Sequence, residues 1–235
     1  MAAPLLLLPG MLSDDAFWAA QVRDLADVCA PRVIANEVLD SFEKMAARVL
    51  ALAPERFALA GHSMGGRVAL EVYRQAPERV TKLALLATDF RGVANADERA
   101  VEVAQRQAWL ETAREDGMEA FAKVWLKQVV APDNLSDRSL VAAITAMTAR
   151  QPIALLEAQT LAALVRADYA AMLPRIACPT LLCAGEADTW RPVSLHEEMA
   201  ALIPASRLVV MAGSGHMLAM EQPEAVTNAM RQWLL

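Results

Sequence analysis

The sequence predicts an α/β protein with a doubly wound, mainly parallel sheet of about six strands. Short apolar runs of strand length alternate with stretches of helical period, and the runs are apolar throughout, as expected of strands that helices cover on both faces. With 56% hydrophobic and 21% charged residues, the 235 residues are enough for a well-buried core in one large domain or two small ones. The expected strands lie near residues 5–8, 32–36, 57–60, 83–88, 180–184 and 208–211.

The elements follow one another from the start of the chain. After the first strand, Ser13 is expected to cap a helix whose early Asp14 and Asp15 suit its positive end. The second strand is followed by a helix over about residues 41–52, and the third strand leads into a further helix that opens at Met64. Strand and helix therefore alternate as far as the fourth strand.

The alternation stops between residues 91 and 172, where helical patterns follow one another without a strand-like run. This predicts a core made of residues 1–90 and 173–235, interrupted by a helical segment at 91–172. Such helices either roof a binding pocket or form a second core without functional contact, since amphipathic helices must pack somewhere. The helices are expected at residues 101–114, 118–130, 139–149 and 153–164.

The most informative motif is Gly61-His62-Ser63-Met64-Gly65, which stands between an apolar run and a helix-like stretch. A serine at such a sharp turn holds an unfavourable backbone conformation that lifts its hydroxyl above the sheet. The glycines let strand and helix cross closely, and the N–H of Met64 at the helix start is suited to bind a developing negative charge. The pattern predicts a nucleophile at Ser63; the alternative is a chance match in a tight turn.

A nucleophilic serine needs a base, because its hydroxyl is inert until an imidazole takes the proton. The chain has three histidines, His62, His196 and His216. His216 follows the last apolar run through the flexible loop 212–215, at the strand end where catalytic groups of parallel sheets gather. His62 is expected to set the local shape of the turn and His196 to lie on a solvated helix surface. His216 is therefore the predicted base.

An acid is needed to orient the imidazole and to stabilise its charged form. Asp188 follows the strand at 180–184, and the order serine, acid, histidine is the one that this architecture requires. Asp89 is the competitor, because it closes the preceding strand, whereas Glu186 is expected to be a solvated neighbour. The prediction is Asp188.

Taken together, four motifs resemble those of the α/β-hydrolase superfamily over nearly the whole chain. The resemblance implies a trimmed version of that fold in which the segment 91–172 is a helical cap over the pocket. It also implies an oxyanion hole formed by the backbone N–H groups of Met11 and Met64, although Pro9 stands where the family usually has histidine. The motifs are Leu8-Pro9-Gly10-Met11, Gly61-His62-Ser63-Met64-Gly65-Gly66, Gly185-Glu186-Ala187-Asp188 and Gly213-Ser214-Gly215-His216.

The activity that this resemblance implies is that of a serine hydrolase. It would cleave a small, mostly apolar carboxylic ester, thioester or lactone through an acyl-enzyme, without cofactor or metal. Leu12 and Trp190 are expected substrate contacts. Three arginines, Arg67, Arg91 and Arg191, are candidate anchors for a carboxylate; the alternative for each is a role in surface charge or ion pairing. Two alternatives stay open: a same-triad lyase or carbon–carbon hydrolase acting on a carboxylate-bearing metabolite, and a ligand-binding protein that keeps the fold without the catalysis.

Composition narrows the expected partners and setting. A net charge of −6 argues against binding to nucleic acid, and no apolar run approaches membrane-spanning length. The start of the chain lacks the basic residues of a secretory signal, and three irregularly spaced cysteines suggest reduced thiols. We expect a cytoplasmic enzyme whose partner is a small ester-like molecule; its oligomeric state is not predicted.

Overall fold

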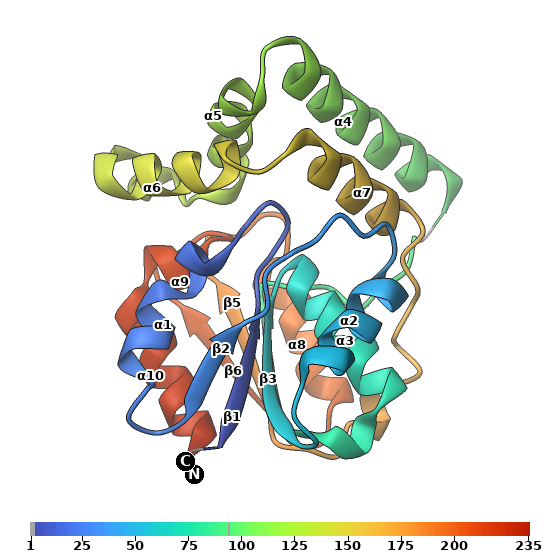
Figure 1. Ribbon diagram of the computed structural model, residues 1–235, viewed down its shortest axis with the longest axis vertical. Coiled ribbons are helices and arrows are strands. Elements are labelled where there is room, and N and C mark those ends of the chain that lie inside the picture. Colours follow the sequence, from blue (N-terminus) through green and yellow to red (C-terminus); the bar gives the residue numbers. More distant parts are fainter. Residues whose placement is uncertain (1–2, 94) are drawn as a thin grey trace.

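The centre of the protein is one parallel sheet of six strands in the order β2-β1-β3-β4-β5-β6 (Figure 1). The structure is a computed structural model that describes residues 3–93 and 95–235. All five strand pairs run parallel, which confirms the predicted fold class. The strands are β1 (Pro4–Leu8), β2 (Ala30–Val33), β3 (Phe57–His62), β4 (Val80–Leu86), β5 (Thr180–Gly185) and β6 (Ser206–Met211).

Helices cover both faces of this sheet, as the apolar strands require (Figure 1). On one face lie α1 (Ala19–Asp24), α9 (Leu218–Glu221) and α10 (Pro223–Leu234). On the other lie α2 (Phe42–Leu52), α3 (Met64–Gln75) and α8 (Val193–Leu202). The inner strands β3 and β5 are buried along their whole length, whereas the edge strands β2 and β6 are only partly buried.

Four further helices lie above the carboxyl ends of the strands, and we call residues 96–164 the roof (Figure 1). They are α4 (Ala96–Glu115), α5 (Met118–Val129), α6 (Arg138–Ala149) and α7 (Ile153–Leu164), at the positions that the sequence predicts. No single helix within residues 3–93 and 95–235 is long and apolar enough to cross a membrane; α6 and α7 satisfy that test only as a pair, which is bent by 88°. Short 3₁₀ turns complete the chain: η1 (Asp15–Trp18), η2 (Pro77–Arg79), η3 (Pro132–Ser136) and η4 (Leu173–Arg175).

Two local predictions were wrong. Asp14, not Ser13, caps the first turn: its carboxylate accepts from the N–H of Ala16 at 3.0 Å, while the Ser13 hydroxyl donates to a backbone carbonyl. The second strand runs over Ala30–Val33 and not over residues 32–36. Its register against β1 runs from Pro4↔Ala30 to Leu7↔Val33, so the pairing begins two residues before the expected strand.

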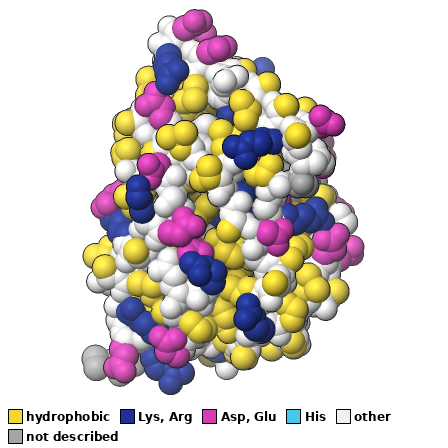
Figure 2. All heavy atoms as spheres, turned by 90° about the vertical axis from the view of Figure 1, so that its right-hand side faces the viewer, with side chains coloured by type: hydrophobic (Ala, Val, Ile, Leu, Met, Phe, Trp, Pro, Cys, Tyr) yellow, Lys and Arg dark blue, Asp and Glu magenta, His cyan; other side chains and the backbone are white. Residues whose placement is uncertain are grey.

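The surface carries charges of both signs. On the face that Figure 2 presents, Lys and Arg side chains stand singly among Asp and Glu, and hydrophobic side chains lie between them. The three cysteines, Cys29, Cys178 and Cys183, are free thiols. Within the part of the chain that the structure describes, no group of three or more His, Cys, Asp or Glu side chains is arranged to hold a metal ion.

Candidate active site

Ser63 occupies a strained turn between β3 and α3. Its φ of 51° and ψ of −115° lie outside the conformations that non-glycine residues prefer. A Cβ atom on Gly61 would lie 2.2 Å from the carbonyl oxygen of Gly65, and one on Gly65 would lie 2.3 Å from that of Leu8. Because neither backbone could accept a side chain there, the two glycines let β3, α3 and the end of β1 meet at the serine.

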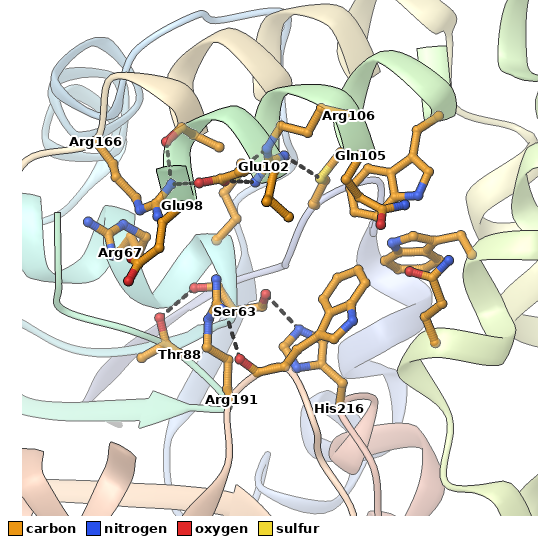
Figure 3. A pocket seen from close by; sticks show the side chains of 18 of the residues that line it. Ser63, Arg67, Thr88, Glu98, Glu102, Gln105, Arg106, Arg166, Arg191 and His216 are labelled. Atoms are coloured by element: carbon orange, nitrogen blue, oxygen red, sulfur yellow. Dashed lines mark hydrogen bonds and ion pairs between the residues drawn. The ribbon is translucent and has the colours of Figure 1, made fainter. Parts of the chain in front are cut away.

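The hydroxyl of Ser63 belongs to a chain of hydrogen bonds. It donates to Nε2 of His216 at 2.8 Å (Figure 3). Nδ1 of the same ring donates to Oδ2 of Asp188 at 2.7 Å. We assign these directions because an ionised carboxylate only accepts, which puts the ring proton on Nδ1. The second carboxylate oxygen, Oδ1, accepts from the N–H groups of Trp190 and Arg191 at 2.8 and 2.9 Å.

The carboxyl group of Asp188 is buried, yet it is held in its ionised form. Burial by itself would raise its pKa, but the imidazole of His216 and the backbone N–H groups favour the charged state more strongly. The net effect is a pKa well below the usual value of 3.8. The side chain therefore presents a negative charge to Nδ1 of His216 throughout the neutral range.

The other two acids of the sequence analysis lie elsewhere. Asp89 accepts from the N–H of Arg91 at 2.9 Å, and its carboxylate lies 3.9 Å from the guanidinium of Arg191. Glu186 is exposed and accepts from the N–H of Gly213. Of the three predicted candidates, only Asp188 contacts the ring of His216.

His62 is a buried support for His216. Its Nε2 donates to the backbone oxygen of His216 at 2.8 Å, and its ring stacks on Phe17 with 4.1 Å between centroids. Burial, together with the neighbouring His216, lowers the pKa of His62 to about 3, so this ring stays neutral. The position is in keeping with the shape-setting role that the sequence suggests.

His196 does not lie on a solvated surface, and this prediction was wrong. Its side chain is fully buried, with Nδ1 donating to the carbonyl of Pro192 and Nε2 accepting from the N–H of Thr88, both at 3.2 Å. It shares the inner face of α8 with the buried Leu195 and Met199. The polar residues around it in the sequence face solvent, so local polarity was a poor guide to this position.

Met11 and Met64, the two residues of the expected oxyanion hole, both lie at the cavity. No residue that the structure describes accepts a hydrogen bond from either backbone N–H. A Cβ on Gly10 would lie 2.6 Å from the ring of His62, so glycine lets this loop approach. Pro9, which replaces the usual histidine, packs its carbonyl against Gly65.

A cavity of about 670 Å³ opens between the serine and the roof. This is a size that small organic ligands occupy. Part of its wall is aromatic: the ring of Trp190 lies 5.6 Å from Trp109, 6.2 Å from Trp125 and 5.5 Å from His216, measured between centroids. Trp190, one of the predicted substrate contacts, therefore covers the side of the histidine.

The other two predicted substrate contacts lie differently. Leu12 is fully buried outside the lining of the cavity, and its N–H donates to Oε1 of Gln159 in the roof at 2.9 Å. Its side chain belongs to the hydrophobic core and not to the cavity lining.

Arg67 lines the cavity, but its guanidinium is engaged with the protein. It donates to the backbone carbonyls of Asp89, Arg91 and Ala167 at 2.9, 3.0 and 2.6 Å, and it lies over the rings of Phe42 and Tyr169. These bonds join the end of β4 to the chain that returns from the roof. The structure thus favours a structural role for this arginine.

Sequence reasoning missed an ion cluster on the roof side of the cavity, formed by Glu102, Arg106 and Arg166 (Figure 3). The pair Glu102 and Arg106 has helical i,i+4 spacing, which was a readable signal. The spacing alone does not show whether such a pair faces solvent or the interior of the protein, and most pairs of this kind face solvent. Here the pair points inward.

The loop of His216 is docked on the roof. Its N–H donates to the carbonyl of Val129, the last residue of α5, at 2.8 Å. A Cβ on Gly215 would lie 2.5 Å from the backbone nitrogen of Ala131, so the two chains are in close contact. The carboxylate of Glu221 binds both, accepting from the N–H groups of Ala131 and Gly215.

A parallel sheet that presents a serine on a strained turn, with a histidine and an ionised aspartate behind it, defines the class of serine hydrolases. Comparison with known proteins agrees. The family model described as alpha/beta hydrolase fold matches residues 32–223, and the chain belongs to this family.

Relatives and solved structures share this fold over most of the chain. A pimeloyl-[acyl-carrier protein] methyl ester esterase of Aliivibrio salmonicida is 29% identical over 177 residues, which cover 74% of this chain and 67% of that protein. One from Nitrosomonas europaea is 26% identical and covers 94% and 91%. The structure of a thermophilic esterase from Thermogutta terrifontis superposes with a TM-score of 0.86 at 29% identity, covering 100% of this chain and 90% of that one. The predicted enzyme class, a carboxylic ester hydrolase on the α/β-hydrolase fold, is confirmed.

Proposed function

We propose that Ser63, His216 and Asp188 are the catalytic triad of this hydrolase. The observation that carries the proposal is the hydrogen-bonded series from the Ser63 hydroxyl through the imidazole to a buried, ionised carboxylate. The strained turn adds to it, because non-glycine residues with positive φ occur preferentially at functional sites.

In the first half of the reaction, Ser63 Oγ attacks the carbonyl carbon while its proton passes to Nε2 of His216. The electron pair of the carbonyl moves to its oxygen, and the N–H groups of Met11 and Met64 bind the resulting oxyanion. Asp188 stabilises the imidazolium. When the tetrahedral intermediate collapses, the ester C–O bond breaks and the leaving alkoxide takes the proton from Nε2.

In the second half, water replaces the alcohol. His216 takes a proton from the water as the water oxygen attacks the acyl carbon, and a second oxyanion forms at the same two N–H groups. When this intermediate collapses, the bond between the acyl carbon and Ser63 Oγ breaks, and Oγ takes the proton from Nε2. Free carboxylic acid and unmodified enzyme result. The substrate is a small carboxylic ester, thioester or lactone, of a size that the 670 Å³ cavity accommodates.

Residues 91–172 act as the cap of this site. The aromatic wall formed by Trp109 and Trp125 belongs to the cap, and it excludes water from the side of the cavity next to Trp190 and His216. The three free thiols support a cytoplasmic setting, where cysteines stay reduced.

Replacing Ser63 by alanine tests the assignment. We expect kcat for p-nitrophenyl esters to fall by at least about 10³-fold, because no other group forms the acyl-enzyme. Ser139→Ala, which alters an exposed serine of the roof, is the matched control and should leave kcat unchanged. A fluorophosphonate should label wild type and Ser139→Ala but not Ser63→Ala. Ordinary turnover by Ser63→Ala would refute the triad, and labelling without turnover of any ester would refute hydrolysis in favour of ligand binding.

A further inference from the structure

Two guanidinium groups share one carboxylate on the roof side of the cavity. Oε1 of Glu102 accepts from Nε and Nη2 of Arg106 at 2.9 and 2.7 Å, and Oε2 accepts from Nη1 of Arg166 at 2.6 Å. The side chains of Glu102, Arg106 and Arg166 are only 22%, 12% and 14% exposed. A surplus positive charge so far from bulk water is costly unless an anion compensates it.

The charges of this cluster are fixed. Burial alone would raise the pKa of Glu102, but the two arginines lower it below the usual range and keep the carboxylate ionised. Burial lowers the pKa of Arg106 somewhat, yet a guanidinium stays protonated in proteins. The cluster therefore holds two positive charges and one negative charge at neutral pH.

Part of each guanidinium lacks an oxygen partner. Among the described residues, the one hydrogen-bond partner of Arg106 Nη1 is the thioether sulfur of Met11, at 4.0 Å, and sulfur is a weak acceptor. Nε of Arg166 is buried without a hydrogen-bond partner in the described chain. Figure 3 shows Arg106 above the cavity with this contact drawn from its free side. That side therefore points to the loop of Met11, whose N–H is one of the two proposed donors to the substrate carbonyl oxygen.

From this geometry we propose that Arg106 anchors a carboxylate of the substrate, so that the natural substrate is a half-ester of a dicarboxylic acid or a lactone that carries a carboxylate. The inference rests on the proposed function, because it places the ester at Ser63. A substrate carboxylate bound to Nη1 of Arg106 would balance the charge of the cluster, because two arginines would then face two carboxylates, that of Glu102 and that of the substrate. It also replaces the thioether by an oxygen acceptor, which a buried guanidinium binds far more strongly.

The remaining charges around the cavity do not cancel this preference. Asp97 and Glu98 also line it, but they are exposed in the first turn of α4, and Glu98 lies eight residues, or about 12 Å along the helix, from Arg106. On the opposite side Arg191 also lines the cavity, and Asp89 lies 3.9 Å from its guanidinium. The lining thus holds four arginines against three carboxylates, in a chain whose net charge is −6.

Matched substrates with one or no free carboxylate test the anchor. The monoethyl and diethyl esters of succinate, glutarate and adipate share the reacting group, and acid release in a pH-stat gives kcat/KM for each. We expect wild type to prefer the monoethyl ester of at least one acid. Arg106→Gln should lose about 10- to 100-fold in kcat/KM for that half-ester, which is the range for one charge-assisted hydrogen bond, and less than about threefold for its diester.

Two control variants separate the anchor from general effects of charge and of folding. Arg114→Gln alters an arginine of the same helix that pairs with Glu157 on the surface and is 56% exposed. This variant should change kcat/KM neither for the half-ester nor for the diester. Arg106→Lys keeps the charge without the planar donor fork, and it should retain part of the preference for the half-ester.

A second measurement needs no variant. Free glutarate and adipate should slow the labelling of wild-type Ser63 by a fluorophosphonate, while the matched neutral diamides should not. If no half-ester is preferred over its diester and no dicarboxylate slows labelling, the anchor is refuted, and the hydrolase assignment stands as long as neutral esters are turned over. If neutral activated esters are not turned over either, it is the proposed function that fails.

Discussion

Replacing Asp188 by asparagine removes one charge while keeping nearly the same shape. Oδ1 of Asp188 accepts from two backbone N–H groups, those of Trp190 and Arg191, and Oδ2 accepts from Nδ1 of His216. The amide of asparagine has one oxygen and one NH₂ group, so one of these two places must change from acceptor to donor.

The surroundings decide which place changes. Putting the NH₂ group at Oδ1 would leave two backbone donors without acceptors, at a cost of about 1–3 kcal/mol each. We therefore expect the NH₂ group at the position of Oδ2, where it donates to Nδ1 of His216. The ring proton then moves to Nε2, and Nε2 becomes a donor to Ser63 and no longer a base.

The expected effect is large. In the serine protease triad, the same exchange of aspartate for asparagine lowers kcat by about 10⁴-fold, which corresponds to about 5.5 kcal/mol in the activation free energy. We expect a loss of that order here, with little loss of folded protein, because the two backbone hydrogen bonds to Oδ1 are kept.

The assay is kcat for p-nitrophenyl butanoate at neutral pH, with circular dichroism to verify the fold. Asp89→Asn is the matched control, since Asp89 follows the neighbouring strand and does not contact His216. It should retain kcat. If a folded Asp188→Asn kept more than about a tenth of wild-type kcat, the assignment of Asp188 as the orienting acid would be refuted.

Two further predictions concern the support of this site. Thr88 Oγ1 donates to the backbone oxygen of Ser63 at 2.6 Å. Because such a hydrogen bond is worth about 1 kcal/mol, Thr88→Val should lower kcat about fivefold, whereas Thr88→Ser should not lower it. Steady-state kinetics of both variants test this, and an unchanged kcat in Thr88→Val would contradict it. The second concerns acid. Because the folded state lowers the pKa of Asp188 below 3.8, its ionisation stabilises the fold above about pH 4 and loses that effect as pH falls towards the folded pKa. Urea unfolding should therefore show a gap between wild type and Asp188→Asn that narrows below pH 4, and a constant gap would contradict the low pKa.

The sequence was informative where backbone geometry demands a particular residue. The turn at Ser63 needs glycine at positions 61 and 65, because backbone atoms leave no room for a Cβ there. A requirement of this kind can be recognised directly in the amino-acid sequence. His216 and Asp188 were located because a parallel sheet brings the carboxyl ends of its strands to one edge. The bounds of β2 were not predicted correctly, because they depend on the register of β2 against β1.

The sequence was a poor guide where the direction of a side chain depends on distant packing. His196 lies among polar neighbours but on the face of α8 that turns to the sheet, so local composition predicted the opposite of its burial. Glu102 and Arg106 form an ordinary i,i+4 pair, and only the position of α4 over the cavity turns them inward. Arg166, beyond the end of α7, joins them from 64 residues after Glu102. The expectation of a mostly apolar cavity, based on Leu12 and Trp190, therefore left out these charged side chains.

The contact between the loop of His216 and the end of α5 limits how this enzyme opens. The N–H of His216 donates to the carbonyl of Val129, and the carboxylate of Glu221 accepts from the N–H groups of both Gly215 and Ala131. A roof that lifted at this corner would carry the base away from the nucleophile. Admission of substrate and assembly of the base are compatible only if the roof pivots at this corner and parts from the core on the side of the first turn of α4. The contact at Val129 would then stay in place during opening, and His216 would remain hydrogen-bonded to Ser63 in both the open and the closed state.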